Sequence, residues 1–214
     1  MPGNHWRECY DFALPQRDGA LRQTQPGEKK TDKLFDGTAP DAVDQLAASL
    51  LAQLTPPWAR WFAFAPGVEA TEDERRDMAE ELERAALAMK SHFDRSNFAI
   101  EMHQCYLDLV TAGTASLLFE EAPPGEPSAF RFTAVPLGQV VFEESAYGRL
   151  DTTYRRSELT LAQMKVRFPD TTLPDDFVKH AKDDPDARIA VAKQIVEELV
   201  PAVKERGEEA LYQR

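Results

Sequence analysis

The chain has few cysteines and no long apolar run, and each shortage excludes a class of protein. Its 214 residues include two cysteines, Cys9 and Cys105, which are too few and too far apart for a disulfide framework. No stretch is apolar for long enough to span a bilayer. The N-terminus MPGNHWRECYDF lacks the basic and apolar regions of a secretory signal. We therefore expect a reducing, cytosolic origin and no membrane partner.

Positive charge is also scarce. There are 25 Lys and Arg residues against 37 Asp and Glu residues, which gives a formal net charge of −12. Proteins that read a DNA sequence usually present a basic patch, so this balance disfavours a repressor or a nuclease. It is compatible with a conduit, because DNA that slides should not be held by counterion release. Most acidic proteins are simply soluble, so charge alone assigns no function.

Sequence motifs of catalysis are missing as well. There is no P-loop and no GxSxG elbow. The nearest approach to a ligand cluster is His92, Glu101, His103 and Cys105. Glu101 and His103 are two residues apart and therefore diverge on a helix, and Cys105 falls on an apolar stripe. The sequence thus predicts no catalytic, cofactor-binding or metal-binding residue, and we expect no cofactor and no enzyme.

The most informative stretch that is present runs from Lys33 to Phe64, KLFDGTAPDAVDQLAASLLAQLTPPWARWFAF. Apolar residues recur at helical spacing, with Thr38 as the expected N-cap, and Pro56-Pro57 must end that helix. The aromatic residues that follow predict a strand whose side chains lie in the core or at a subunit interface. These candidate residues are Trp58, Trp61, Phe62 and Phe64.

The bounds of the remaining helices are predicted from capping residues and from glycine and proline residues that end helices. A short helix is expected over 4–12, and the polar residues 13–37 predict an extended arm. Thr71 and Glu74 have the spacing of a capping box, which begins a helix that reaches about His92. Ser96 is expected to cap the next helix, and Gly113 to end it.

Strand spacing dominates the second half of the chain. Runs at 116–121, 130–134, 139–143 and 150–156 predict an antiparallel meander of about four strands. A second capping box, Thr160 with Gln163, begins a helix that ends at Phe168, and a short helix is expected over 175–182. For 187–203 the periodicity favours a helix over a strand. The fold class is α+β, with helices packed on a small antiparallel sheet.

Several segments, in the same order along the chain, resemble one known family. They are Leu14-Pro15-Gln16-Arg17, the stretch from Lys33 to Phe64, Ser96–Glu121 with its Leu109-Val110-x-x-Gly113 element, Phe132–Gly148, and Leu150–Pro169 with Arg155-Arg156. Together they resemble the head-to-tail connecting (portal) proteins of short-tailed, T7-like bacteriophages. The resemblance implies a portal wing domain, and it implies a strand rather than a helix near the C-terminus.

Under this resemblance the domains are an N-terminal helix and arm over 1–37, a wing-like domain over 38–182 and a terminal segment over 183–214. The stem, clip and crown of full-length relatives are not recognisable, so we expect only the N-terminal wing portion, truncated before the stem.

The resemblance also implies a function. Full-length relatives form a dodecameric ring at one capsid vertex, and DNA is packaged and ejected through it. The implied partners are further copies of the chain, capsid, terminase and tail adaptor proteins, and transient, non-specific double-stranded DNA. The implied location is the virion, and the host cytoplasm during assembly.

Two alternatives stay open. One is a stand-alone acidic interaction module from a prophage remnant, and the other is a small soluble hydrolase.

Overall fold

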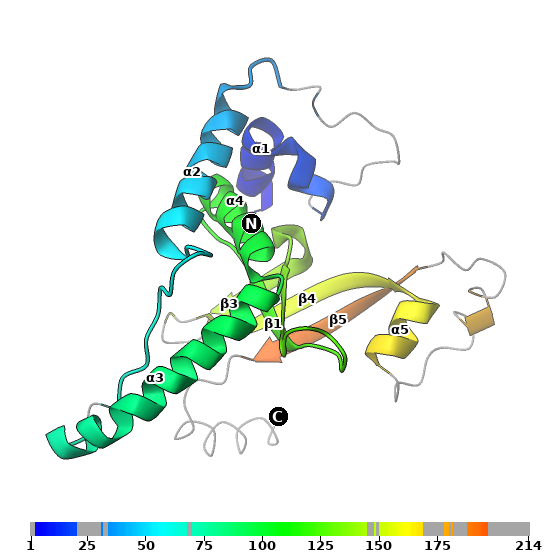
Figure 1. The fold of residues 1–214 in the computed structure, drawn as a ribbon. Helices are drawn as coiled ribbons and strands as arrows, with labels where there is room; N and C mark the ends of the chain where they lie inside the picture. Colours follow the sequence, from blue (N-terminus) through cyan, green and yellow to red (C-terminus); the bar gives the residue numbers. More distant parts are fainter. Residues whose placement is uncertain are drawn as a thin grey trace. The chain divides into compact units, whose positions relative to one another are not determined.

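The chain folds as two compact units, which are described separately (Figure 1). In this computed structural model the described residues are 3–20, 31, 34–67, 70–144, 148, 150–168, 178–179, 181 and 188–196. The first unit is Met1–Gly138 and the second is Gln139–Arg214. Both combine helices with antiparallel strands, which confirms the α+β class.

Three helices pack against one another in the first unit: α1 (Gly3–Ala13), α2 (Thr38–Leu54) and α4 (Phe98–Ala112). The predicted helices over 4–12 and after Thr38 are therefore confirmed. Apolar stripes meet between α2 and α4, because small and β-branched side chains of α2 face aromatic and aliphatic side chains of α4. The buried residues of this core are Val43, Ala47, Tyr106 and Leu107.

The start of α2 differs from the prediction. Gly37 occupies the N-cap position and Thr38 is already helical. The carboxylate of Asp36 accepts hydrogen bonds from the backbone N–H of Thr38 at 3.0 Å and from its hydroxyl at 2.9 Å. Asp36, two residues before Thr38, therefore satisfies the first free N–H of α2, and the N-cap residue itself contributes no side-chain bond.

The long helix α3 (Glu72–Arg95) begins with the predicted capping box, in which Thr71 and Glu74 bond each other's backbone N–H groups. Residues 71–81 are all exposed, so the first half of α3 runs out beyond the other helices of its unit (Figure 1). Ser96 then accepts the N–H of Phe98 at 3.1 Å and so helps to start α4, although Asn97 is the N-cap residue.

Gly113 ends α4 in the left-handed conformation, with φ 73°, as predicted. The strands β1 (Leu117–Glu121) and β2 (Phe130–Ala134) follow and form a two-stranded antiparallel sheet, with Phe119 opposite Phe132. The predicted aromatic strand after Pro57 does not form. Its rings pack on α3 and α4 instead of entering a sheet, since Trp61 contacts Phe93 and Phe98.

The second unit is a sheet of order β3-β4-β5, made of β3 (Val140–Glu144), β4 (Leu150–Thr160) and β5 (Arg188–Val196). The short helix α5 (Leu161–Arg167) begins at the predicted capping box of Thr160 and Gln163. The prediction of a single meander is wrong. The strands fall into two sheets, because the turn η2 (Leu137–Gln139) separates β2 from β3.

The helix preferred for 187–203 was also wrong, and the strand implied by the resemblance is confirmed over Arg188–Val196. Strand β5 pairs antiparallel with β4 from Thr160↔Arg188 to Thr152↔Val196. A full ladder with a long neighbouring strand outweighs a helical periodicity, particularly for a run rich in Val and Ile.

Some predictions fall partly outside the described residues. Of the expected arm over 13–37, the part Pro15–Ala20 is the 3-10 helix η1, and 21–30 lie outside the described residues. Of the expected helix over 175–182, the described residues 178, 179 and 181 are helical. The expected domain boundary at 182 lies outside the described residues. Within the described residues, no helix combines the length and hydropathy needed to cross a membrane.

Candidate functional site

Tryptophan and phenylalanine rings from the segment after Pro57 and from α3, α4, β1 and β2 pack into one group, here called the aromatic cluster. Trp61 stacks on Phe98 with centroids 5.7 Å apart and planes at 13°. Phe93 meets Phe98 edge to face at 4.7 Å, and Phe98 meets Phe132 at 5.0 Å. The members are Trp61, Phe62, Phe64, Phe93, Phe98, Phe119, Phe130 and Phe132.

The four aromatic residues singled out from the sequence do not act alike. Trp61, Phe62 and Phe64 belong to the aromatic cluster and are partly covered by it. Trp58 is 75% exposed and has no ring contact with another described aromatic residue. Sequence reasoning missed the partner rings on α3, α4, β1 and β2, although the alternation of Phe130 and Phe132 already indicated one inward face.

Polar contacts hold the aromatic segment along α3. Lys90 Nζ donates to the carbonyl oxygen of Pro57 at 3.1 Å, and Arg60 Nη1 lies 2.7 Å from Glu83 Oε1. Both contacts link residues just before the clustered rings to α3. They keep Trp61 and its neighbours next to the second half of that helix, where Phe93 lies.

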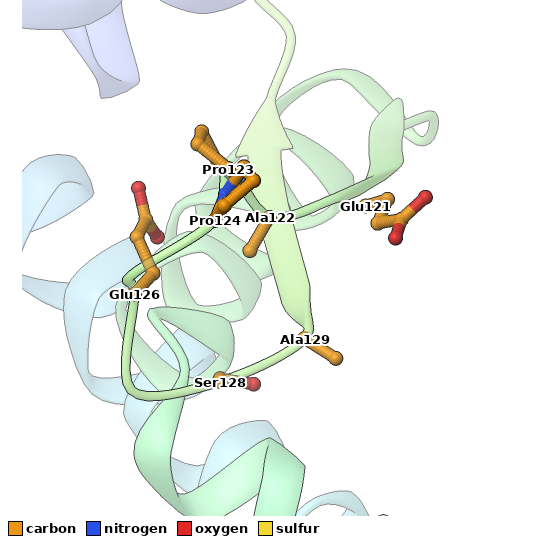
Figure 2. A pocket seen from close by; sticks show the side chains of 7 residues that line it. All are labelled: Glu121, Ala122, Pro123, Pro124, Glu126, Ser128 and Ala129. Atoms are coloured by element: carbon orange, nitrogen blue, oxygen red, sulfur yellow. The ribbon is translucent and has the colours of Figure 1, made fainter.

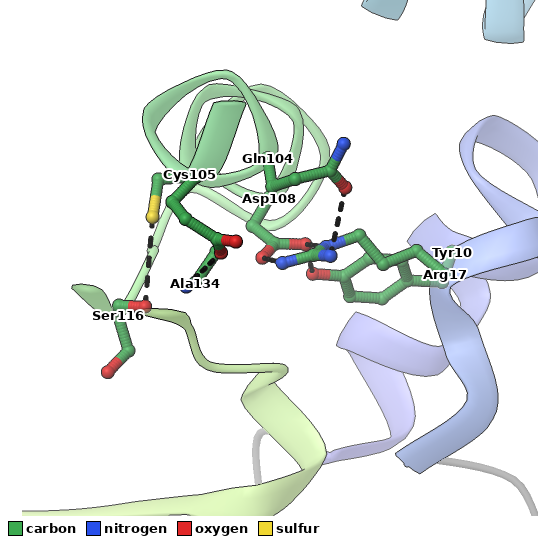
Figure 3. A network of polar contacts seen from close by, with 8 residues as sticks. Tyr10, Arg17, Gln104, Cys105, Asp108, Ser116 and Ala134 are labelled. Atoms are coloured by element: carbon green, nitrogen blue, oxygen red, sulfur yellow. Dashed lines mark hydrogen bonds and ion pairs between the residues drawn. The ribbon is translucent and has the colours of Figure 1, made fainter. Parts of the chain in front are cut away.

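A buried polar network ties the N-terminal segment to α4 (Figure 3). The Asp108 carboxylate accepts from Tyr10 OH at 2.7 Å and, through both oxygens, from Arg17 Nε at 2.6 Å and Nη2 at 2.7 Å. Arg17 Nη1 donates to Gln104 Oε1 at 3.0 Å. This bidentate pair is the strong form of an arginine–carboxylate contact. No motif in the sequence indicates this network, because Tyr10 and Arg17 lie more than 85 residues before their partners on α4.

Burial and charge oppose each other in this network. The Asp108 side chain is fully buried and that of Arg17 is 16% exposed. Burial by itself would lower the pKa of Arg17, but hydrogen bonds and charge from Asp108 outweigh that effect, so the pKa of Arg17 is raised. The guanidinium stays charged, so its bonds to Asp108 hold the N-terminal segment on α4.

Cys105 lies on the same helix and faces the core, as its apolar stripe predicted. Its thiol points to the carbonyl oxygen of Ser116 at 3.7 Å (Figure 3). Burial, with the nearby charge of Asp108 as a second cause, raises the pKa of Cys105 to about 12. A thiol in this state is a poor nucleophile, because the thiolate is the reactive form.

The side chains considered as metal ligands each contact a different group and do not converge on one point. His92 Nδ1 accepts the backbone N–H of Ala129 at 3.2 Å, and Glu101 accepts that of Ala134 at 2.7 Å. His103 Nε2 lies 4.0 Å from Asp44. No group of three His, Cys, Asp or Glu side chains suited to a metal ion occurs in the described part of the chain.

A surface hollow lies at the turn between β1 and β2 (Figure 2). Its one hydroxyl is already used, since Ser128 donates to the carbonyl oxygen of His92 at 2.8 Å and accepts the N–H of Phe130 at 3.0 Å. These bonds fix the turn against α3. The lining residues are Glu121, Ala122, Pro123, Pro124, Glu126, Ser128 and Ala129.

Stacked rings, a buried ion pair and capped helices make the first unit a packed α+β domain. The sequence matches the family model of the bacteriophage head to tail connecting protein over residues 3–207. The chain therefore belongs to the head to tail connecting protein family.

The chain is similar to two phage proteins named as portal proteins and to one uncharacterized protein. A protein named "Probable portal protein" of Bordetella phage BPP-1 is 28% identical over 166 residues, and the "Portal protein" of Salmonella phage epsilon15 is 24% identical over 169 residues. Each match covers 77% of this chain and 29% of the relative, so the chain spans less than a third of the length of these portal proteins. An uncharacterized protein of Natronomonas pharaonis is 42% identical over 65 residues, which are 30% of this chain and 77% of that protein.

Proposed function

We propose that this chain is a structural part of a phage portal, the head-tail connector ring through which DNA is packaged and ejected. The observation that carries the proposal is the family match, which extends over residues 3–207. The two relatives named as portal proteins support it, since 77% of this chain aligns with each. The role is structural rather than enzymatic, and it places the chain in the virion.

The proposed partners follow from the same role. They are further copies of the chain in a dodecameric ring, the capsid shell, the terminase and the tail adaptor, with assembly in the host cytoplasm. Double-stranded DNA passes transiently and without sequence reading. The net charge of −12 suits this, because an acidic wall does not hold phosphates by counterion release.

Within the ring we assign the aromatic segment two roles. Trp61, Phe62 and Phe64 close the core of the first unit, supported by their contacts with Phe93 and Phe98. Trp58 is the residue proposed for the contact between subunits, because it is a large ring that is 75% exposed beside a stiff diproline.

The test is a stop codon early in the reading frame of this chain in its phage. We expect particles that lack DNA, and we expect the intact gene supplied in trans to restore DNA-filled particles. The matched variant Trp58→Ala should give stable protein with fewer DNA-filled particles. Normal yields of infectious, DNA-filled particles from the interrupted gene would refute the portal role.

The stand-alone interaction module is the second candidate, favoured by one observation. The relative from Natronomonas pharaonis is matched over 77% of its own length by only 65 residues, so part of this sequence recurs in a short protein. This candidate predicts that purified phage particles contain no copy of the chain, which mass spectrometry of the particles decides.

A further inference from the structure

A single residue of α3 fastens the turn between β1 and β2, which is formed by residues 122–129. The Ser128 hydroxyl donates to the backbone carbonyl oxygen of His92 at 2.8 Å. The backbone N–H of Ala129 donates to Nδ1 of the His92 ring at 3.2 Å. The first bond uses only the backbone of His92, whereas the second needs an imidazole that can accept. One of these two anchors therefore depends on the charge of the ring.

The bond from Ala129 fixes the protonation state of the ring. A neutral imidazole carries its proton on one nitrogen and accepts through the other, so an accepting Nδ1 places the proton on Nε2. In the imidazolium ion both nitrogens carry protons, and Nδ1–H would then face the N–H of Ala129. Two donors cannot bond each other, so this bond exists only while His92 is neutral. Histidine is also the side chain whose charge changes closest to neutral pH.

The charged ring has support of a different kind. His92 lies in the last turn of α3, where the helix dipole stabilises a positive charge. Its ring centroid lies 5.3 Å from that of Phe130, with the planes at 43°, and the face of an aromatic ring attracts a cation within about 6 Å. A neutral ring therefore holds the turn, and a charged ring is held by the helix end and Phe130 instead. Two states with different partners are what a switch requires.

No carboxylate of a described residue binds the ring. Within that part of the chain His92 forms no ion pair, and its ring bonds only Ala129. The nearby Asp94 on α3 is already paired with Lys90. An acidic partner therefore does not lock the ring in its charged form. The charged groups of the elements around the ring are Lys90, Asp94 and Arg95 on α3, Glu101 on α4, Glu120 and Glu121 on β1, Glu126 in the turn and Arg131 on β2.

We propose that His92 is a pH-sensitive switch that holds or releases the turn formed by residues 122–129. The neutral ring holds Ala129 at the end of α3. When the ring takes up a proton, the bond from Ala129 is lost, while the bond from Ser128 to the backbone of His92 remains. Release of Ala129 reshapes the surface hollow, because Ser128 and Ala129 are among its lining residues (Figure 2). The inference rests on the first unit alone and not on the portal role.

The experiment is a pH titration of the full chain, followed by NMR. The two signals are the Cε1 proton of the His92 ring and the amide proton of Ala129. We expect the Ala129 amide to move upfield as the pH falls, because it loses its hydrogen bond, and to do so with the same midpoint as the ring proton. The amide of Val135, which bonds the Ser116 carbonyl oxygen at 2.8 Å, should stay protected throughout and so report an intact sheet.

Three variants localise the effect. His92→Asn supplies a carboxamide oxygen as the acceptor and does not titrate, whereas His92→Ala removes the acceptor. At any one pH, the Ala129 amide should exchange about fivefold faster in the alanine variant than in the asparagine variant. The parent should match His92→Asn at about pH 8 and His92→Ala at about pH 5. The matched control His103→Asn changes a histidine on α4 and should behave as the parent does.

Three results would overturn the proposal. An Ala129 amide that keeps its chemical shift while the His92 ring titrates would mean that the turn does not respond to the ring. The same pH response in His92→Asn as in the parent would assign the response to another group. Equal exchange rates in His92→Asn and His92→Ala would show that the bond from Ala129 does not hold the turn.

Discussion

Asp108 is a carboxylate without solvent exposure, and it depends on partners that come from the other end of the first unit. Arg17 and Tyr10 supply three hydrogen bonds between 2.6 and 2.7 Å. A buried pair adds little compared with a well-packed apolar pair, but removing one member leaves the other charge stranded. We therefore expect the packing of the N-terminal segment on α4 to depend on Asp108.

The first prediction concerns this pair. Asp108→Ala should lower the free energy of unfolding by about 3 kcal/mol, because it strands the Arg17 guanidinium in a part-buried place. Urea denaturation measures the change. The control is Glu83→Ala, which breaks the more exposed contact with Arg60 and should cost less than about 1 kcal/mol. Equal losses in the two variants would contradict the assigned role.

The second prediction separates the two cysteines. Cys105 is buried with a pKa of about 12, so at pH 8 its thiolate is about 1,000-fold rarer than for a thiol at the ordinary value of 9.0. Cys9 is only half-buried. Labelling with iodoacetamide at pH 8 should modify Cys105→Ser protein readily and Cys9→Ser protein far more slowly. Similar rates in the two variants would show that Cys105 is accessible.

At the scale of elements, sequence predicted local structure well where the determinant was local. Both capping boxes, the diproline stop and the Gly113 ending are set by a few neighbouring residues, and all are present. Predictions failed where the structure depends on contacts between residues far apart in the sequence. The tail Arg188–Val196 became a strand because β4 pairs with it, and the segment after Pro57 formed no strand because its rings found partners on α3 and α4.

The third prediction concerns the end of α4. Gly113 has φ 73°, and a Cβ there would meet no atom within 4 Å, so Gly113→Ala carries a backbone penalty alone, of about 1 kcal/mol. Thermal unfolding measures it. Gly67→Ala, in equally open space, has no positive φ to strain and should stay within about 0.5 kcal/mol of the parent. A neutral Gly113→Ala would count against the left-handed ending.

The fourth prediction is a pH effect at the start of α3. Hydrogen bonds from the backbone and side chain of Thr71 lower the pKa of Glu74 below 4.5. A lowered carboxylate pKa stabilises the fold above the ordinary value, and this contribution is lost as the pH falls from 4.5 through the folded pKa. Helicity by circular dichroism should therefore fall in that range. Glu74→Gln keeps an acceptor but does not titrate, so the difference between the two proteins should shrink toward low pH. A constant difference would contradict the cap.

At the scale of the whole molecule, the α+β class and most helices follow from periodicity, whereas the division into two sheets does not. Strand spacing marks the strands but not their neighbours, since pairing depends on the turns between them. Residues 137–139 form a 3-10 turn, and β3 begins a second sheet after it. The same limit hid the candidate site, because the partners of Trp61 and of Asp108 come from distant parts of the chain.

The proposed portal role is tested most directly by finding where the chain lies in the particle. Antibodies against the first unit, visualised with gold by electron microscopy on phage particles opened gently enough to expose the vertices, give the position. We predict label at one vertex of each shell, the vertex that bears the tail. Label spread over all vertices, or particles that contain the capsid protein but bind no label, would contradict a part in the head-tail connector.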